Sequence, residues 1–189
     1  MSTRDVTKID RTSGRLVKDP TSFAAAFPHG GTELGAVRAV ELEFMVGKVG
    51  LVLAEEYGGV PVEGVDPADW AVLYCLLRQW DDTAIAAIWP NTATGAASGS
   101  KVITGGAKGA VRAGALLTAR AAKILFVPDD ATNHRSIYLP RAIPVIVGES
   151  RVAASVLRES NVEVSWIGLP DGSATRRSYQ VGKLADLTL

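Results

Sequence analysis

Residues with the chemistry of a catalytic or metal site are few, and their spacing is poor. His29 and His134 have no cysteine or second histidine at the spacing that a zinc site needs. Asp129, Asp130 and His134 are close enough in sequence to form a small metal or acid–base cluster, but a solvated hairpin tip accounts for them more simply. Cys75, the single cysteine, lies in an apolar run, where burial would leave its thiol unreactive.

The glycine-rich and serine-containing segments also lack the known catalytic patterns. Residues 105–109 (Gly-Gly-Ala-Lys-Gly) match neither the phosphate-binding loop nor the dinucleotide fingerprint. Residues 98–100 (Ser-Gly-Ser) lack the strand-to-helix setting of a nucleophile elbow. Adjacent carboxylates point in different directions on a strand, so the acidic pairs at 55–56 and 81–82 do not predict a catalytic dyad. We therefore predict that the chain is not an enzyme and requires no metal and no cofactor.

Charge is balanced overall but unevenly distributed. Twenty basic and twenty acidic residues give a net charge of zero, which argues against a simple nucleic-acid binder. Residues 33–82 hold ten acids and three bases, whereas residues 100–127 hold five bases and no acid. Complementary patches of this kind register protein contacts, and a contact between unlike patches is head-to-tail. Neutralisation within one subunit is the alternative. The candidate subunit-interface residues are Lys101, Lys108, Arg112, Glu55, Glu56, Asp81 and Asp82.

Several segments alternate with the period of a β-strand. Residues 39–46 place Val40, Leu42 and Phe44 on one face and Glu41 and Glu43 on the other. Further strands are expected at 49–54, 83–89, 116–127, 136–139, 143–147, 152–157 and 161–169. The Asp171-Gly172 pair predicts a hairpin turn, with 177–181 as the return strand.

One helix is expected between Asp66 and Gln79. Asp66 suits the N-cap, and Pro67 suits the first helical position. Trp70, Leu73, Tyr74 and Leu77 then follow at three- and four-residue spacing.

Two segments stand apart from this pattern. Residues 1–32 have little periodicity and are expected to form an N-terminal arm ahead of a single domain over 33–189. Residues 91–114 are rich in glycine and poor in large apolar residues, which indicates a long loop or hairpin insertion that orders against a neighbouring subunit. The whole predicts a mainly β (α+β) fold: an antiparallel β-sandwich or barrel with one flanking helix.

The cellular location is predicted from the lack of a signal peptide pattern and of a membrane-spanning run in the sequence. The first 20 residues are polar and mixed in charge, unlike a signal peptide. No run approaches the roughly 20 apolar residues that span a bilayer. A single cysteine fits a reducing compartment. We expect a protein made in a cytoplasm without membrane insertion.

The order of these features resembles the bacteriophage tail tube (major tail) proteins. The resemblance runs from about residue 35 to 189. It includes the early strand with glutamates on one face (residues 40–44), the helix near residues 70–79, the glycine-rich insertion, and the closing segment 162–172.

The resemblance implies a structural role. Six copies would form a ring, and stacked rings would form a tube that conducts the genome into the host. The partners would be further copies, other tail proteins and DNA in transit. The location would be the virion tail, after assembly in the host cytoplasm. A channel that passes DNA should not bind it tightly, so Glu41 and Glu43, on the polar face of the first strand, are candidates for the lumen wall.

Two alternatives remain open. One is another phage ring or shell protein: a tail terminator, a head–tail adaptor or a capsid decoration protein. The other is a monomeric β-barrel that binds a small ligand.

Overall fold

A computed structural model describes the fold of most of the 189-residue chain. Its described part is mainly β, with one short α-helix, which confirms the expected fold class. The described residues are 13–46, 50–54, 60–65, 69–78, 82–89, 92–94, 101–103, 117–146, 162–174 and 176–189. The strands are β1 Gly14–Lys18, β2 Thr32–Val46, β3 Gly50–Ala54, β4 Val60–Val65, β5 Asp69–Leu77, β6 Thr92–Thr94, β7 Lys101–Ile103, β8 Ala122–Pro128, β9 Ser136–Ile146, β10 Val162–Gly168 and β11 Gln180–Gly182. The helices are α1 Asp82–Ile88 and two 3-10 turns, η3 Leu117–Arg120 and η4 Leu184–Asp186.

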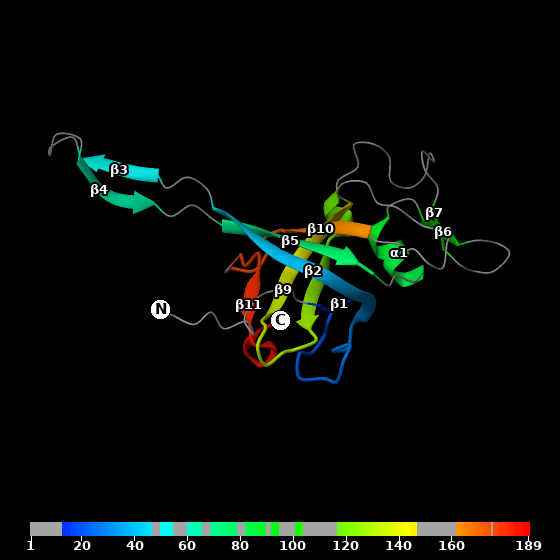
Figure 1. Cartoon of the computed structure of the whole chain (residues 1–189). Coiled ribbons are helices and arrows are strands. Elements are labelled where there is room, and N and C mark those ends of the chain that lie inside the picture. Colours follow the sequence, from blue (N-terminus) through cyan, green and yellow to red (C-terminus); the bar gives the residue numbers. More distant parts are fainter. Residues whose placement is uncertain are drawn as a thin grey trace, which may run out of the picture.

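Six antiparallel strands close into a barrel (Figure 1). The order is β10-β5-β2-β1-β8-β9, and pairing of β10 with β9 closes the ring. The long strand β9 makes closure possible because the two halves of one of its edges pair with two different strands. Residues 142–146 pair with β10, while residues 136–138 pair with the extra strand β11.

Side chains fill the barrel interior. Alternate residues of each strand point inward, as the twofold period of a strand requires. The bulky, fully buried inward residues include Trp166, Phe126, Leu73 and Leu16. Helix α1 adds Ala84 and Ile88 to this core, and the guanidinium of Arg120 donates to the carbonyls of Ala87 (3.2 Å) and Ile88 (2.6 Å) at the helix C-terminus.

The segment between β10 and β11 packs closely against β10 and β5. A side chain at Gly168 would lie 2.8 Å from the carbonyl oxygen of Ser178 and 3.1 Å from that of Ala71. Glycine is therefore needed at residue 168 for this close approach. Tyr179 follows and contacts the Phe44 ring, with centroids 5.2 Å apart.

A second, smaller core covers the outer face of β1, β8 and β9. It joins Val17, Leu125 and Tyr138 to Leu187 near the C-terminus. The loop between β1 and β2, blue at the bottom of Figure 1, adds Phe23, whose ring meets Tyr138 edge-on at 5.0 Å. The outer face is thus sealed by segments from both ends of the described chain.

Two short ladders lie apart from the seven-stranded sheet. Strands β3 and β4 pair with each other, and Figure 1 shows them beyond the barrel, at the end of β2 and β5. Strands β6 and β7 form the second ladder, within the segment expected to be a glycine-rich insertion, and β7 contacts α1.

The expected helix at 66–79 is wrong over its described part. Residues 69–77 form β5, an internal strand paired to β2 on one edge and to β10 on the other. Almost every residue in this run is apolar, so it fits a period of two as well as one of 3.6. The strand is favoured over the helix because, within the barrel, it buries every second residue in the core: Ala71, Leu73, Cys75 and Leu77.

The α-helix found among the described residues lies where a strand was expected, at 83–89. Residues 82–88 form α1, which is rich in alanine, the strongest helix former. Its Ala84 and Ile88, four residues apart, are the buried pair. Asp82 stands in the first turn, where a carboxylate favours the positive end of the helix dipole.

The expected closing hairpin is also wrong, although its turn exists. Gly172 has φ +81°, and Asp171 accepts hydrogen bonds from the backbone N–H (2.9 Å) and hydroxyl (2.6 Å) of Ser173. The chain does not then return along β10. It forms β11, which pairs with β9.

Part of the expected N-terminal arm belongs to the barrel. Gly14–Lys18 is strand β1, placed between β2 and β8, with Leu16 and Val17 fully buried. The strand has only five residues, too few for a clear period in the sequence. The arm interpretation applies at most to residues 1–12, which lie outside the described residues.

The strand assignment of β5 predicts a specific stability effect. Leu73→Ala should lower the free energy of unfolding by about 2–5 kcal/mol, because it removes a fully buried inward side chain. The neighbouring change Tyr74→Phe removes only an outward hydroxyl and should cost far less. Urea unfolding of both variants checks this, and equal losses would contradict the assignment.

Candidate interaction surfaces

Cys75 is placed for packing and not for reaction. It faces the barrel core with 1% of its surface exposed, and its Sγ donates to the Val164 carbonyl at 3.6 Å. Burial raises the pKa of the thiol to about 12. The reactive thiolate is therefore almost absent at neutral pH.

The two histidines have structural roles in separate loops. His29 is buried, its ring Nδ1 donates to the Ala25 carbonyl at 2.8 Å, and Phe27 meets it edge-on. These contacts link residues of the loop between β1 and β2 to one another. His134 lies in the β8–β9 turn, where its backbone N–H donates to the Asp130 carbonyl.

The Asp130 carboxylate is already occupied by that turn. It accepts from the backbone N–H groups of Thr132 and Asn133 and from the Asn133 side chain at 2.7 Å. The Asn133 side-chain bond is the main reason that the pKa of Asp130 is lowered. Within the described part of the chain, no group of three or more His, Cys, Asp or Glu residues could hold a metal ion.

Most of the charged residues expected at a subunit interface lie outside the described residues. These are Glu55, Glu56, Asp81, Lys108 and Arg112. Lys101 begins β7, and Asp82 begins α1 with its side chain exposed. Their roles at an interface remain predictions.

The two lumen candidates lie side by side in an acidic groove. Glu41 and Glu43 are exposed on the outer face of β2, as their alternation predicts. With Glu163 of β10 and Tyr74 of β5, they line a recess of about 350 Å³. The Tyr74 pKa is raised, chiefly by its hydrogen bond with Glu43 and next by burial.

Sequence reasoning missed two members of this groove. Tyr74 was expected on a helix, which would have separated it from β2. Glu163 was recognised only as a polar residue of an alternating strand. The strand order brings them together, because β5 lies between β2 and β10 and pairs Tyr74 with Glu41 and Leu76 with Glu163.

A basic groove lies elsewhere on the barrel. It has a volume of about 520 Å³ and lies where β9 meets the chain that leaves β10. Arg141 of β9 and Arg176 supply its charge, and both are exposed. Leu169 and Pro170 form its apolar side.

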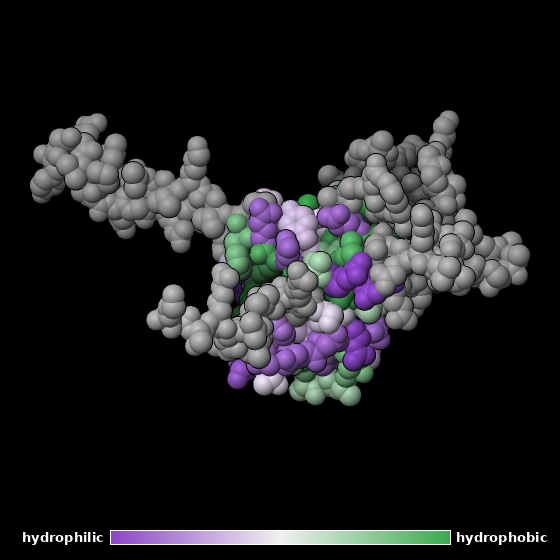
Figure 2. Space-filling view, in the orientation of Figure 1, coloured by the Kyte–Doolittle hydropathy of each residue, from purple (hydrophilic) through white to green (hydrophobic). Residues whose placement is uncertain are grey.

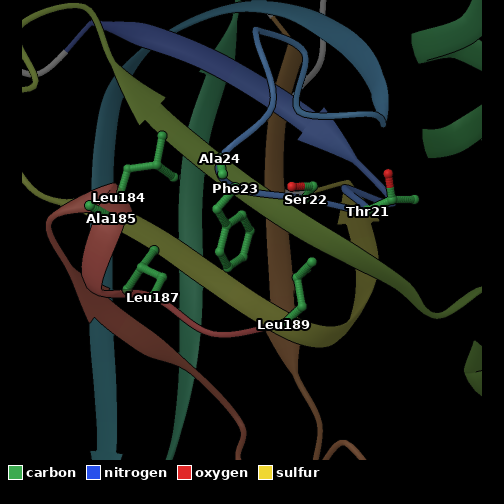
Figure 3. A pocket seen from close by; sticks show the side chains of 8 residues that line it. All are labelled: Thr21, Ser22, Phe23, Ala24, Leu184, Ala185, Leu187 and Leu189. Atoms are coloured by element: carbon green, nitrogen blue, oxygen red, sulfur yellow. The ribbon is translucent and has the colours of Figure 1, made fainter.

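A third recess is mainly apolar (Figure 3). It lies between the β1–β2 loop and the C-terminal residues and has a volume of about 590 Å³. Phe23 points toward Leu187 across it. Three hydrogen bonds between Gln180 and Thr188 hold the C-terminal side in place.

Large apolar side chains are also exposed where β2 and β5 leave the barrel. Phe44 is 51% exposed and Trp70 is 41% exposed. Figure 2 shows hydrophobic areas above and below a band of hydrophilic residues on the visible face. Exposed aromatic residues of this kind are commonly found at protein contacts.

Comparison with known proteins adds no family to this description. A scan against models of protein families found no match, and a search of curated proteins found none. Among the described residues, no helix is long and apolar enough to cross a membrane.

Burial of Cys75 predicts that the folded protein resists thiol reagents. With a pKa of about 12, the thiolate fraction at pH 8 is on the order of a thousandfold below that of a free cysteine. Ellman's reagent should not label the native protein, and it should label one thiol per chain in guanidinium chloride. Rapid labelling of the native protein would show that Cys75 is accessible.

Proposed function

We propose that the chain is a self-assembling virion structural protein, a subunit of a phage tail tube made of stacked rings. Each subunit would be a single barrel that contacts further copies of itself. The tube would conduct the genome into the host. The resemblance to tail tube proteins supplies this identity, and the barrel with its short helix agrees with the fold which that family implies.

The observation that carries the proposal is the β3–β4 ladder. Its main contacts are between its own two strands, and it lies away from the barrel in Figure 1. The strands read Gly-Leu-Val-Leu-Ala and Val-Pro-Val-Glu-Gly-Val, so they are almost wholly apolar. An isolated two-stranded ladder is only marginally stable in water. Packing on a neighbouring subunit would stabilise it.

The strand that leads into this ladder supports the same conclusion. Pairing of β2 with β1 ends at Val37, while pairing of β2 with β5 continues to Val46. Among the described strands, none pairs with the other edge of residues 41–46. Open edges invite pairing with another chain, and assembly is one way to cover them.

A ring or shell protein other than a tube subunit could use the same ladder. A terminator or adaptor would stop at one ring, so the length of the assembly distinguishes these proteins from a tube. The ligand-binding barrel is less well supported, because fully buried side chains, Trp166 and Phe126 among them, occupy the described interior of the barrel.

Electron microscopy tests the proposal directly. Negatively stained wild-type protein at high concentration should form tubes of stacked rings. Isolated rings would favour a terminator or adaptor. A protein that sediments as a monomer at every concentration would overturn the proposal.

Removal of the ladder should separate folding from assembly. Val46 and Asp69 are register partners, so an Asn-Gly turn can replace residues 47–68 and close a hairpin between them. The variant should unfold in urea at nearly the wild-type midpoint but remain monomeric. Tubes formed by this variant would exclude the ladder as the assembling contact.

A further inference from the structure

Three carboxylates on one side of the barrel form a concave acidic surface, the acidic groove. Glu41, Glu43 and Glu163 are all exposed and line the recess on β2, β5 and β10. The one base on the same stretch of β2, Arg38, is half-buried and has another interaction within the chain. No ion pair among the described residues neutralises the three glutamates.

The basic groove has the opposite charge and a comparable size. Arg141 and Arg176 are exposed, and neither forms an ion pair within the described part of the chain. The Asp171 carboxylate, in the turn that precedes Arg176, already accepts from the Ser173 hydroxyl at 2.6 Å and from Arg177 Nε at 3.3 Å. The two arginines therefore remain available to an external anion.

The two grooves cannot satisfy each other within one subunit. Arg141 lies on β9 and Glu41 on β2, and these strands are three places apart in the ring in either direction. They are thus on opposite sides of a six-stranded barrel. Along β10, Glu163 is near the start and Leu169 follows the end, which is a separation of about 20 Å at the rise of a β-strand.

We propose that the acidic groove of one copy receives Arg141 and Arg176 of the next copy. The contact pairs two different surfaces, so it is head-to-tail and can repeat from subunit to subunit. Arginine suits this role because its planar guanidinium can bind a carboxylate through two hydrogen bonds. The proposal rests on the self-assembly proposed above and assigns two surfaces to it.

This assignment gives Glu41 and Glu43 a different role from the lumen wall. A wall that only repels DNA needs negative charge but no recess. The groove instead offers three carboxylates around a space that can take a side chain. The glutamates then register neighbouring subunits.

Charge reversal tests the pairing. The Glu41→Arg/Glu43→Arg variant should raise the critical concentration for assembly about tenfold or more, and so should Arg141→Glu/Arg176→Glu. Each variant presents two surfaces of like charge. Mixing the two variants, or combining all four changes in one chain, should restore assembly. Sedimentation and negative-stain microscopy at low salt measure this.

Matched controls reverse the same number of exposed charges elsewhere. These are Asp129→Arg/Asp186→Arg and Lys123→Glu/Lys183→Glu, and both should assemble like the wild type. Urea unfolding confirms that each variant is folded.

The outcomes separate the two proposals. Wild-type assembly combined with unimpaired groove variants, or with no rescue on mixing, would overturn the pairing and leave self-assembly intact. A wild type that never assembles would overturn both.

Discussion

Closure of the sheet through β9 is the constraint on which the other features depend. Pairing of residues 142–146 with β10 turns an open sheet into a barrel, and only then do the inward side chains of six strands share one core. A closed barrel has no exposed edge along its circumference. The remaining half of β9 is then free to pair with β11, which brings the C-terminal residues against Tyr138.

The barrel accounts for only part of the length of β2 and β5. Strand β2 has 15 residues, but its pairing with β1 spans only its first six. The rest continues with β5 toward the β3–β4 ladder, carrying Phe44 and Trp70 at the exposed end. The molecule thus combines a barrel that has its own core with a projecting two-stranded element. That division suits a subunit that folds first and then forms contacts with other subunits.

The local sequence predicted well those strands in which polar and apolar residues alternate. Alternation placed Glu41 and Glu43 outward and identified β10, because polar and apolar residues alternate in the sequence of both strands. It was a poor guide to β5, where almost every residue is apolar, so that the run also fits the period of a helix. The position of α1 was also predicted wrongly. Its isoleucines favour a strand, but its three alanines favour the helix that forms.

The grooves were beyond local reasoning. Tyr74, Glu163 and Arg141 acquire their neighbours through pairings that join residues far apart in the chain, and no motif records those pairings. The Asp171-Gly172 turn shows the same limit on a smaller scale. Its geometry is local and was expected, whereas the partner of the strand that follows it is set by the free half of β9.

The position of Cys75 has a practical consequence. The chain's only sulfhydryl is enclosed within the barrel, so the native protein presents no surface thiol that would compete in a labelling reaction. A cysteine introduced at any exposed position would be the sole attachment point for a dye, spin label or cross-linker. Distances between neighbouring copies can therefore be measured without first removing a native residue from the core.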